Sequence, residues 1–210
     1  MSLDTYSNLV TAIQNTLHRT DSGLVASVPD FVTLAEDKLN KRLRIRAMEN
    51  RVTATVSSEY MALPTSFLAV KNMQVNSSPR QILTYAAPDI LDIKYPDPTV
   101  TDTPKFYTFI GGQIQLAPVP DTSYTVEMDY YKAWAIATDG SNWLLTNAPR
   151  CYYYGALMEA AAFLKDDKRI PVWAQLLEKA IEEVDLADSQ DEYPDSALAI
   201  IADSAPFSSR

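Results

Sequence analysis

The spacing of apolar residues changes twice along the chain, and this change constrains the fold more than any other sequence feature. Apolar residues recur every three or four positions in the first 45 residues and again after residue 145, which predicts amphipathic helices. Between these segments they alternate with polar residues, as Val52, Ala54 and Val56 do, which predicts half-buried strands. We therefore expect an α+β fold: a bundle of N- and C-terminal helices with an inserted antiparallel β-rich domain.

Proline and capping residues predict where the helices begin. Residues 20–23 (Thr-Asp-Ser-Gly) are expected to form a loop, so a second helix is expected to start at Ser27, with Pro29 in its first turn. In the C-terminal part, Asn147 is expected to cap one helix, and Pro171 is expected to open the last one. The chain should thus contain two long helices on each side of the β-rich segment.

Turn residues divide the middle of the chain into short strands. Residues 67–75 form one expected strand, and a hairpin is expected between residues 106–110 and 113–116. Gly111-Gly112 joins the two because glycine accepts the positive φ angles of a two-residue turn. Residues 124–130 are expected to follow as the third strand of an antiparallel meander, beside about three earlier strands.

The resulting division has three parts. The helical bundle is expected to comprise residues 1–45 plus 145–189, and the β-rich insertion residues 46–144. The last part, residues 190–210, shifts to Asp, Ser, Pro and Ala and is expected to be an acidic tail with no fixed fold of its own.

Composition argues against several classes of protein. The chain has one histidine, one cysteine and five glycines, and none of the glycines is spaced as a phosphate-binding loop. No cysteine-based zinc site or two-histidine site can come from one chain, so we expect neither a metal nor another cofactor. We expect no secretory signal and no membrane span or anchor, because the sequence contains no apolar run long enough for one, and a single cysteine fits a reducing cytoplasm.

Only weak catalytic constellations remain. His18 with Cys151 could act as base and nucleophile, and Asp166-Asp167 or Asp185 with Asp188 could act as paired carboxylates. A buried structural cysteine, a histidine at a helix end and solvated acids are the simpler interpretations. We therefore expect a protein that is not an enzyme.

Charge and aromatic residues point instead to contacts. From Glu178 onward there are nine acids and two bases, and the whole chain has a net charge of −9. We hypothesise that this acidic stretch meets a basic surface on a neighbouring subunit or partner, the alternative being a solvated face; a head-to-tail contact of that kind can close a ring. Tyr and Trp residues on strand faces opposite to the core are further interface candidates, with ordinary packing as the alternative. The candidate interface residues are Lys38, Lys41, Arg42, Arg44 and Arg46 at the end of the second helix, the aromatics Tyr107, Tyr131 and Trp134, and the acids Glu182, Glu183, Asp185 and Asp188.

Taken in order, short segments over residues 3–185 resemble the adaptor (head-to-tail connector) proteins of tailed bacteriophages, especially short-tailed ones. The segments at the N-terminal end are Tyr6-Ser7-Asn8-Leu9-Val10, Leu17-His18-Arg19-Thr20-Asp21, Val28-Pro29-Asp30-Phe31 and Leu39-Asn40-Lys41-Arg42-Leu43-Arg44. Those further along are Leu63-Pro64-Thr65-Ser66-Phe67-Leu68, Pro104-Lys105-Phe106-Tyr107, Leu116-Ala117-Pro118-Val119-Pro120-Asp121, Tyr130-Tyr131, Asn142-Trp143-Leu144-Leu145 and Tyr152-Tyr153-Tyr154-Gly155-Ala156-Leu157.

The resemblance implies a structural role in the virion, with assembly in the host cytoplasm and no catalysis. It implies a homo-oligomeric ring, commonly of about twelve copies, that docks under the portal protein, extends the DNA channel and recruits a tail or nozzle protein. DNA would only pass through this channel, since specific binding is not expected of an acidic chain. The alternative is a small-molecule or carbohydrate-binding module, or a hydrolase, with an unrelated α+β fold.

Overall fold

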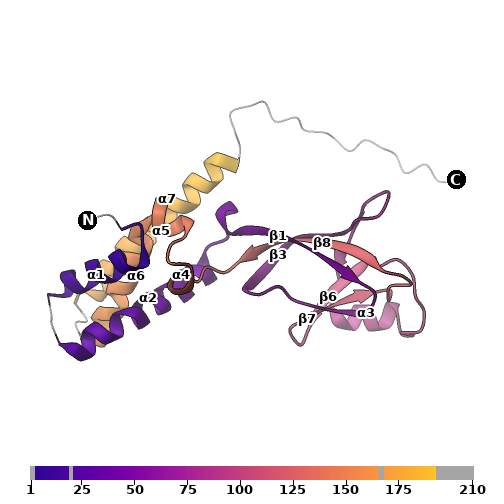
Figure 1. Cartoon of the computed structure of the whole chain (residues 1–210), viewed down its shortest axis with the longest axis horizontal. Helices are drawn as coiled ribbons and strands as arrows, with labels where there is room; N and C mark the ends of the chain where they lie inside the picture. Colours follow the sequence, from indigo (N-terminus) through magenta and orange to yellow (C-terminus); the bar gives the residue numbers. More distant parts are fainter. Residues whose placement is uncertain (1–2, 19–20, 166–167, 193–210) are drawn as a thin grey trace.

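The computed structural model describes residues 3–18, 21–165 and 168–192. Its elements follow the order helices, strands, helices, and they enclose two separate hydrophobic cores, one in a helical bundle and one between two β-sheets (Figure 1). The expected α+β class, with helices at both ends of the sequence and a β region between them, is confirmed. The expected tail lies outside the described residues from residue 193 onward.

The first two helices are α1 (Tyr6–Leu17) and α2 (Ser22–Arg42). The Thr5 hydroxyl caps α1 by accepting a hydrogen bond from the Asn8 N–H at 3.3 Å. The predicted start of α2 at Ser27 is wrong, because the helix begins five residues earlier and contains Pro29 in its interior. Leu24 and Val28 continue the buried stripe of the helix, and this burial offsets the backbone hydrogen bond that proline cannot make.

The C-terminal helices are α5 (Trp143–Asn147), α6 (Pro149–Phe163) and α7 (Ile170–Glu192). The predicted cap at Asn147 is wrong: Asn142 caps α5 by accepting from the Leu145 N–H at 2.8 Å, and Asn147 ends that helix. The sequence analysis did not distinguish the short helix α5 from α6, so it took the end of α5 at Asn147 for the start of a helix. The predicted opening of α7 near Pro171 is confirmed, and the helix runs past residue 190, where the tail was expected to begin.

Helix α6 lies at the centre of the bundle and packs on α1, α2 and α7. At Gly155 a Cβ atom would lie only 2.9 Å from the Cβ of Ala35, so the absence of a side chain lets α2 and α6 approach closely. Leu9 and Ile13 of α1 complete the same core, which also takes in Tyr152 of α6. The small residues of α6 therefore set the spacing of the bundle.

The β region contains two four-stranded sheets. Sheet A has the order β1 (Glu49–Val56), β8 (Tyr124–Lys132), β3 (Phe67–Val75) and β4 (Gln81–Ile82). Sheet B has the order β2 (Tyr60–Ala62), β7 (Gln113–Ala117), β6 (Phe106–Ile110) and β5 (Thr84–Tyr85). Short helices α3 (Pro88–Lys94) and α4 (Ile136–Asp139) and the 3-10 turn Arg46–Met48 complete the chain.

The predicted hairpin is confirmed, but the predicted three-stranded meander is wrong. Strands β6 and β7 pair around Gly111 and Gly112, whose φ angles of 58° and 77° are the positive values that this turn needs. Strand β8 does not pair with β7; it crosses to sheet A and lies between β1 and β3. Eight residue pairs join β1 to β8, and the buried side chains of both strands face sheet B, so long-range pairing prevails over sequence proximity.

Candidate functional site

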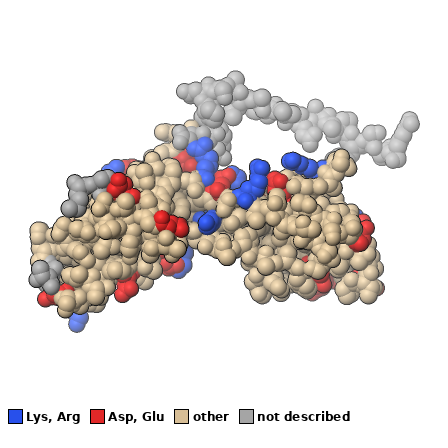
Figure 2. Space-filling view, viewed as in Figure 1, with Lys and Arg blue, Asp and Glu red and all other residues tan. Residues whose placement is uncertain are grey.

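The basic end of α2 lies against the acidic half of α7, within one chain. Arg42 Nη2 lies 3.3 Å from Glu178 Oε1, and Arg46 Nε lies 3.3 Å from Asp188 Oδ1. The Arg46 backbone N–H donates to the same Asp188 oxygen at 3.1 Å. Lysines, arginines and acids accordingly gather along the upper edge of the molecule, where the bundle meets the β region (Figure 2). The two charged segments are thus complementary, and part of this complementarity is satisfied without a second subunit.

The other charged interface candidates divide into paired and unpaired groups. The pairs are Lys38 with Glu159 of α6, Lys41 with Asp37 at 2.6 Å, and Arg150 with Glu183 at 2.9 Å. Arg44 donates to the backbone carbonyl of Asn40 at 2.6 Å, and Glu182 is exposed and makes no ion pair with the described residues. Most of these side chains are solvated, and exposed ion pairs contribute only ~0–1 kcal/mol each to stability. They therefore remain available for contacts with another protein.

Asp185 differs from its neighbours because it is half-buried on α7. Burial raises the pKa of its carboxyl, and the nearby Arg42 guanidinium opposes this rise. The carboxyl thus lies beside the Arg42–Glu178 pair at the contact between α2 and α7. Asp185 therefore takes part in the contact between α2 and α7 of the same chain. Its role in a contact with a second subunit remains a prediction.

The aromatic candidates are not located as the sequence predicted. Tyr107 was expected on an exposed strand face, and this is wrong: only 6% of it is exposed, and it packs inside the β core. Sheet B presents Tyr107 and Leu116 as a cross-strand pair to sheet A, which reverses the expected orientation of β6. Tyr131 and Trp134 are half-buried and pack on the bundle core, where the chain returns from β8 to the helices. They join the two parts of the molecule.

A buried polar network fixes this junction. The Glu36 carboxylate accepts hydrogen bonds from the Ile136 N–H at 2.8 Å and from the Tyr152 hydroxyl at 2.9 Å. One turn further along α2, the Asn40 side chain donates to the Trp134 carbonyl and accepts from the Trp134 N–H, both at 3.0 Å. These bonds attach the linker between β8 and α4 to α2.

Glu36 is the residue that sequence reasoning missed. Only 8% of it is exposed, and burial raises the pKa of its carboxyl, while the bonds from Ile136 and Tyr152 oppose this rise. The sequence signal that could have identified it as buried is its position on the apolar stripe of α2, one turn after Val32 and seven residues before Leu43. An acid in such a position needs internal hydrogen-bond donors.

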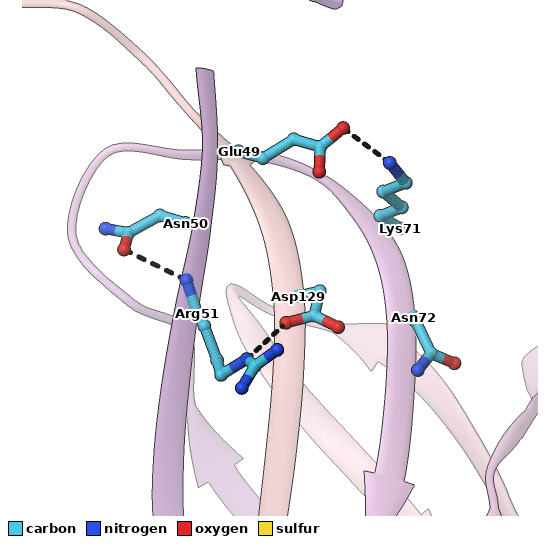
Figure 3. Close-up of a pocket in the computed structure, with 6 residues that line it drawn as sticks. All are labelled: Glu49, Asn50, Arg51, Lys71, Asn72 and Asp129. Atoms are coloured by element: carbon cyan, nitrogen blue, oxygen red, sulfur yellow. Dashed lines mark hydrogen bonds and ion pairs between the residues drawn. The ribbon is translucent and has the colours of Figure 1, made fainter. Parts of the chain in front are cut away.

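A polar depression of about 380 Å³ lies on the outer face of sheet A (Figure 3). Its charged groups are paired across the strands: Arg51 Nε lies 3.1 Å from Asp129 Oδ1, and Lys71 is paired with Glu49. Asn50 accepts from the Arg51 backbone N–H at 2.9 Å, and Asn72 completes the lining. Because its donors and acceptors bond to one another, the depression has the chemistry of a solvated sheet face and presents no nucleophile with a base.

A second, more apolar groove of about 310 Å³ lies between α5, the start of α6 and the C-terminal half of α7. Trp143, Ala148, Ala180, Val184 and Ala187 supply its apolar wall, and Trp143 is 42% exposed. The Arg150–Glu183 ion pair lies at this groove. It has the composition of a protein-contact surface.

The catalytic candidates have the properties of structural residues. Cys151 is completely buried, and burial raises the pKa of its thiol to about 12, so the thiolate is scarce at neutral pH. His18 is exposed at the end of α1, where its backbone adopts a left-handed φ of 48°. Asp166 and Asp167 lie outside the described residues. Across the described ranges, no three His, Cys, Asp or Glu side chains lie together as ligands for a metal ion.

These features define a class of protein: a two-core α+β molecule in which several charged side chains pair within the chain and the candidate aromatic residues pack on its cores. Among the residues that the structure describes, no helix combines the length and apolar character that a bilayer-spanning segment requires. The sequence model of the SU10 adaptor protein family matches residues 4–200. The chain therefore belongs to this family of bacteriophage head-to-tail adaptor proteins. A comparison with curated proteins finds no significant match.

Family membership gives the chain a structural role as a component of the virion that interacts with other virion proteins. It also implies a protein that is not an enzyme. Residues of the bundle and residues of the β region both lie within the matched range.

Proposed function

We propose that the chain is a head-to-tail adaptor that forms a ring, docks under the portal, extends the DNA channel and recruits tail proteins. The observation that carries this proposal is the family match over residues 4–200, which spans both cores. In this proposal the ring contains about twelve copies. The ring is a closed heterologous assembly, in which each subunit uses two different surfaces. Assembly takes place in the host cytoplasm.

The bundle supplies the subunit contacts in this proposal. It exposes large apolar residues on several helices: Trp143 at the α5–α7 groove, Leu34 on α2, Phe163 on α6, and Val172 and Leu186 on α7. Exposed apolar surface of this kind is typical of protein contacts. Exposed apolar residues on several helices of one domain suit a head-to-tail interface, which needs unlike surfaces that meet around the ring.

The acidic residues of α7 support the channel part of the proposal. Glu182 is exposed, and the segment from Glu178 onward has a net charge of −7. An acidic channel wall repels DNA phosphates and reduces sticking during passage. In the same assembly, Glu182 and Arg44 are free to meet charges of the next subunit, because neither is paired with an opposite charge among the described residues.

The test is mass photometry and negative-stain imaging of the purified chain, alone and mixed with the portal protein of the same phage. We expect rings in the presence of the portal. Leu186→Lys is expected to prevent ring closure, because it places a charge in an apolar contact. Thr53→Lys, on the exposed face of β1, is the matched control. A chain that remains monomeric with the portal at micromolar concentrations would refute the proposal.

A further inference from the structure

The end of the β region farthest from the bundle carries apolar and acidic side chains that nothing within the described residues covers. Helix α3 lies at this end (Figure 1), where it packs on β6 of sheet B. Ile90 and Ile93 of α3 are 55% and 81% exposed, and Val100 in the following loop is 58% exposed. We define the α3 patch as Asp89, Ile90, Asp92, Ile93, Asp97 and Val100, all of them exposed.

The charges of this patch are largely uncompensated. Asp89 and Asp92 form no ion pair with the described residues, whereas five acids of the bundle do. Lys94, the only cation of α3, lies over the Phe106 ring with its ammonium 3.9 Å from the ring centroid. Lys105 is held by Asp102 at 2.7 Å. The patch thus combines exposed isoleucines with carboxylates that have no basic partner.

A small cavity at the base of the patch contains only acceptors among its charged groups. Glu59, Asp92 and Asp97 line it, together with Gln115 of β7. Gln115 donates its amide N–H to Glu59 at 2.6 Å, while its own carbonyl oxygen Oε1 is buried without a hydrogen-bond partner. A buried acceptor without a donor is costly, and a ligand that brings an N–H donor removes that cost.

The size of the cavity is compatible with a small donor group. Its volume of about 30 Å³ admits one water-sized group. A lysine ammonium is such a group, and it carries three N–H donors and a positive charge. The acceptors of the cavity therefore favour a positively charged N–H donor such as lysine, with apolar neighbours that cover Ile90, Ile93 and Val100.

We propose that the α3 patch is the docking surface for a segment of another virion protein that presents a lysine among apolar residues. This inference rests on the proposed adaptor function for the source of the partner, since an adaptor has to contact proteins on its tail side. A second copy of the chain is disfavoured as the occupant, because each copy has a net charge of −9 and two acidic copies repel one another.

The test is a binding titration of the full chain with each purified virion protein of the same phage in turn, in low salt and in 0.5 M salt. We expect one of them to bind the wild-type chain, more weakly in high salt. Two variants, Asp89→Lys with Asp92→Lys and Ile90→Ser with Ile93→Ser, are each expected to weaken this binding roughly tenfold or more. All four positions are exposed, so both variants should fold, which circular dichroism checks.

Asp21→Lys with Asp30→Lys is the matched control, since it changes the net charge equally at two exposed acids of the α2 region. The inference is overturned if no virion protein binds the wild-type chain below about 100 μM. It is also overturned if the patch variants bind as the wild type does, or if the only binder is a second copy. Portal-dependent rings are measured in the same variants: normal rings with lost partner binding support the inference, whereas a wild type that forms no rings refutes the proposed function and leaves the binding result standing.

Discussion

The helical bundle and the β region both enclose an apolar core, but their charged surfaces differ. In the bundle, ion pairs join elements that are far apart in the sequence, such as Arg46 with Asp188 and Lys38 with Glu159. At the α3 end of the β region, the described ion pair is the local one between Lys105 and Asp102, and isoleucines lie in the open. The comparison teaches that the bundle satisfies much of its own charge, whereas the far end of the β region leaves charge and apolar area for a partner.

The largest expected effect tests whether the bundle core is independent of the β core. Leu39 is 1% exposed, and Leu39→Asp places an unpaired charge in the bundle, which we expect to destabilise it by about 3–5 kcal/mol. Leu34→Asp is the control, because Leu34 is 50% exposed on the same helix and should change stability little. Urea unfolding followed by circular dichroism measures both.

The same experiment tests the predicted domain division. If the bundle and the β region fold independently, the β signal of Leu39→Asp should persist after the helical signal is lost. Coincident loss of both signals would mean that Tyr131, Trp134 and the Glu36 network couple the two cores into one cooperative unit.

The second prediction concerns Glu36, which connects the two regions. Glu36→Ala leaves the Ile136 N–H and the Tyr152 hydroxyl without their acceptor, and we expect a loss of about 2–4 kcal/mol. Glu36→Gln keeps an acceptor oxygen and should cost much less. Chemical denaturation of the three proteins at one pH gives this order, and equal losses for Ala and Gln would contradict the hydrogen-bond account.

The pH dependence of Glu36 has a definite sign. Because burial raises the folded-state pKa of its carboxyl above the ordinary 4.5, the fold favours the neutral form. The stability that this preference gives is complete below the unfolded-state pKa and is lost as pH rises through the folded-state pKa. Glu36→Gln cannot ionise, so its stability relative to the wild type should increase between pH 4 and pH 7, and a decrease over this range would show that the pKa is lowered instead.

A smaller effect is expected from replacing glycine with alanine where two helices pack closely, compared with the same change on an open helix surface. The Cβ that Gly155→Ala adds meets Ala35 at 2.9 Å, and overpacking of this kind costs about 1–3 kcal/mol, partly offset by the better helix propensity of alanine. Gly23→Ala is the matched change in α2, where no atom lies within 4 Å of the new Cβ, and we expect it to stabilise the chain by up to ~1 kcal/mol. Thermal melts that move in the same direction for both variants would contradict the packing argument.

The smallest expected effect concerns the charge pairs between α2 and α7. Asp188→Asn removes a charged partner of Arg46 and should cost ~1 kcal/mol or less, with the difference shrinking in 0.5 M salt. Glu182→Gln, which breaks no ion pair with the described residues, is the control and should leave stability unchanged. If Asp188→Asn instead leaves the monomer unchanged and impairs only ring assembly, the charge acts between subunits, as the sequence suggested.

Local patterns were enough for the elements whose neighbours in sequence are also their neighbours in space. The Gly111-Gly112 hairpin and the Phe67–Val75 strand were predicted correctly because turn chemistry and alternation act over a few residues. The start of α2 was missed because the burial of Leu24 and Val28 outweighs the proline signal at Pro29. The outward orientation of Tyr107 was wrong because the choice of face depends on where the second sheet lies.

The sequence by itself determined the order of helices, strands and helices, the spacing of apolar residues in each, the excess of acid at the C-terminal end and the family resemblance. Tertiary structure decided which strand β8 joins, the pairing of Arg42 and Arg46 with α7, the burial of Glu36 and the exposure of the α3 patch. The physical reason is range: capping, alternation and turn geometry are set by neighbouring residues, whereas burial and charge pairing depend on segments that only the packed cores bring together.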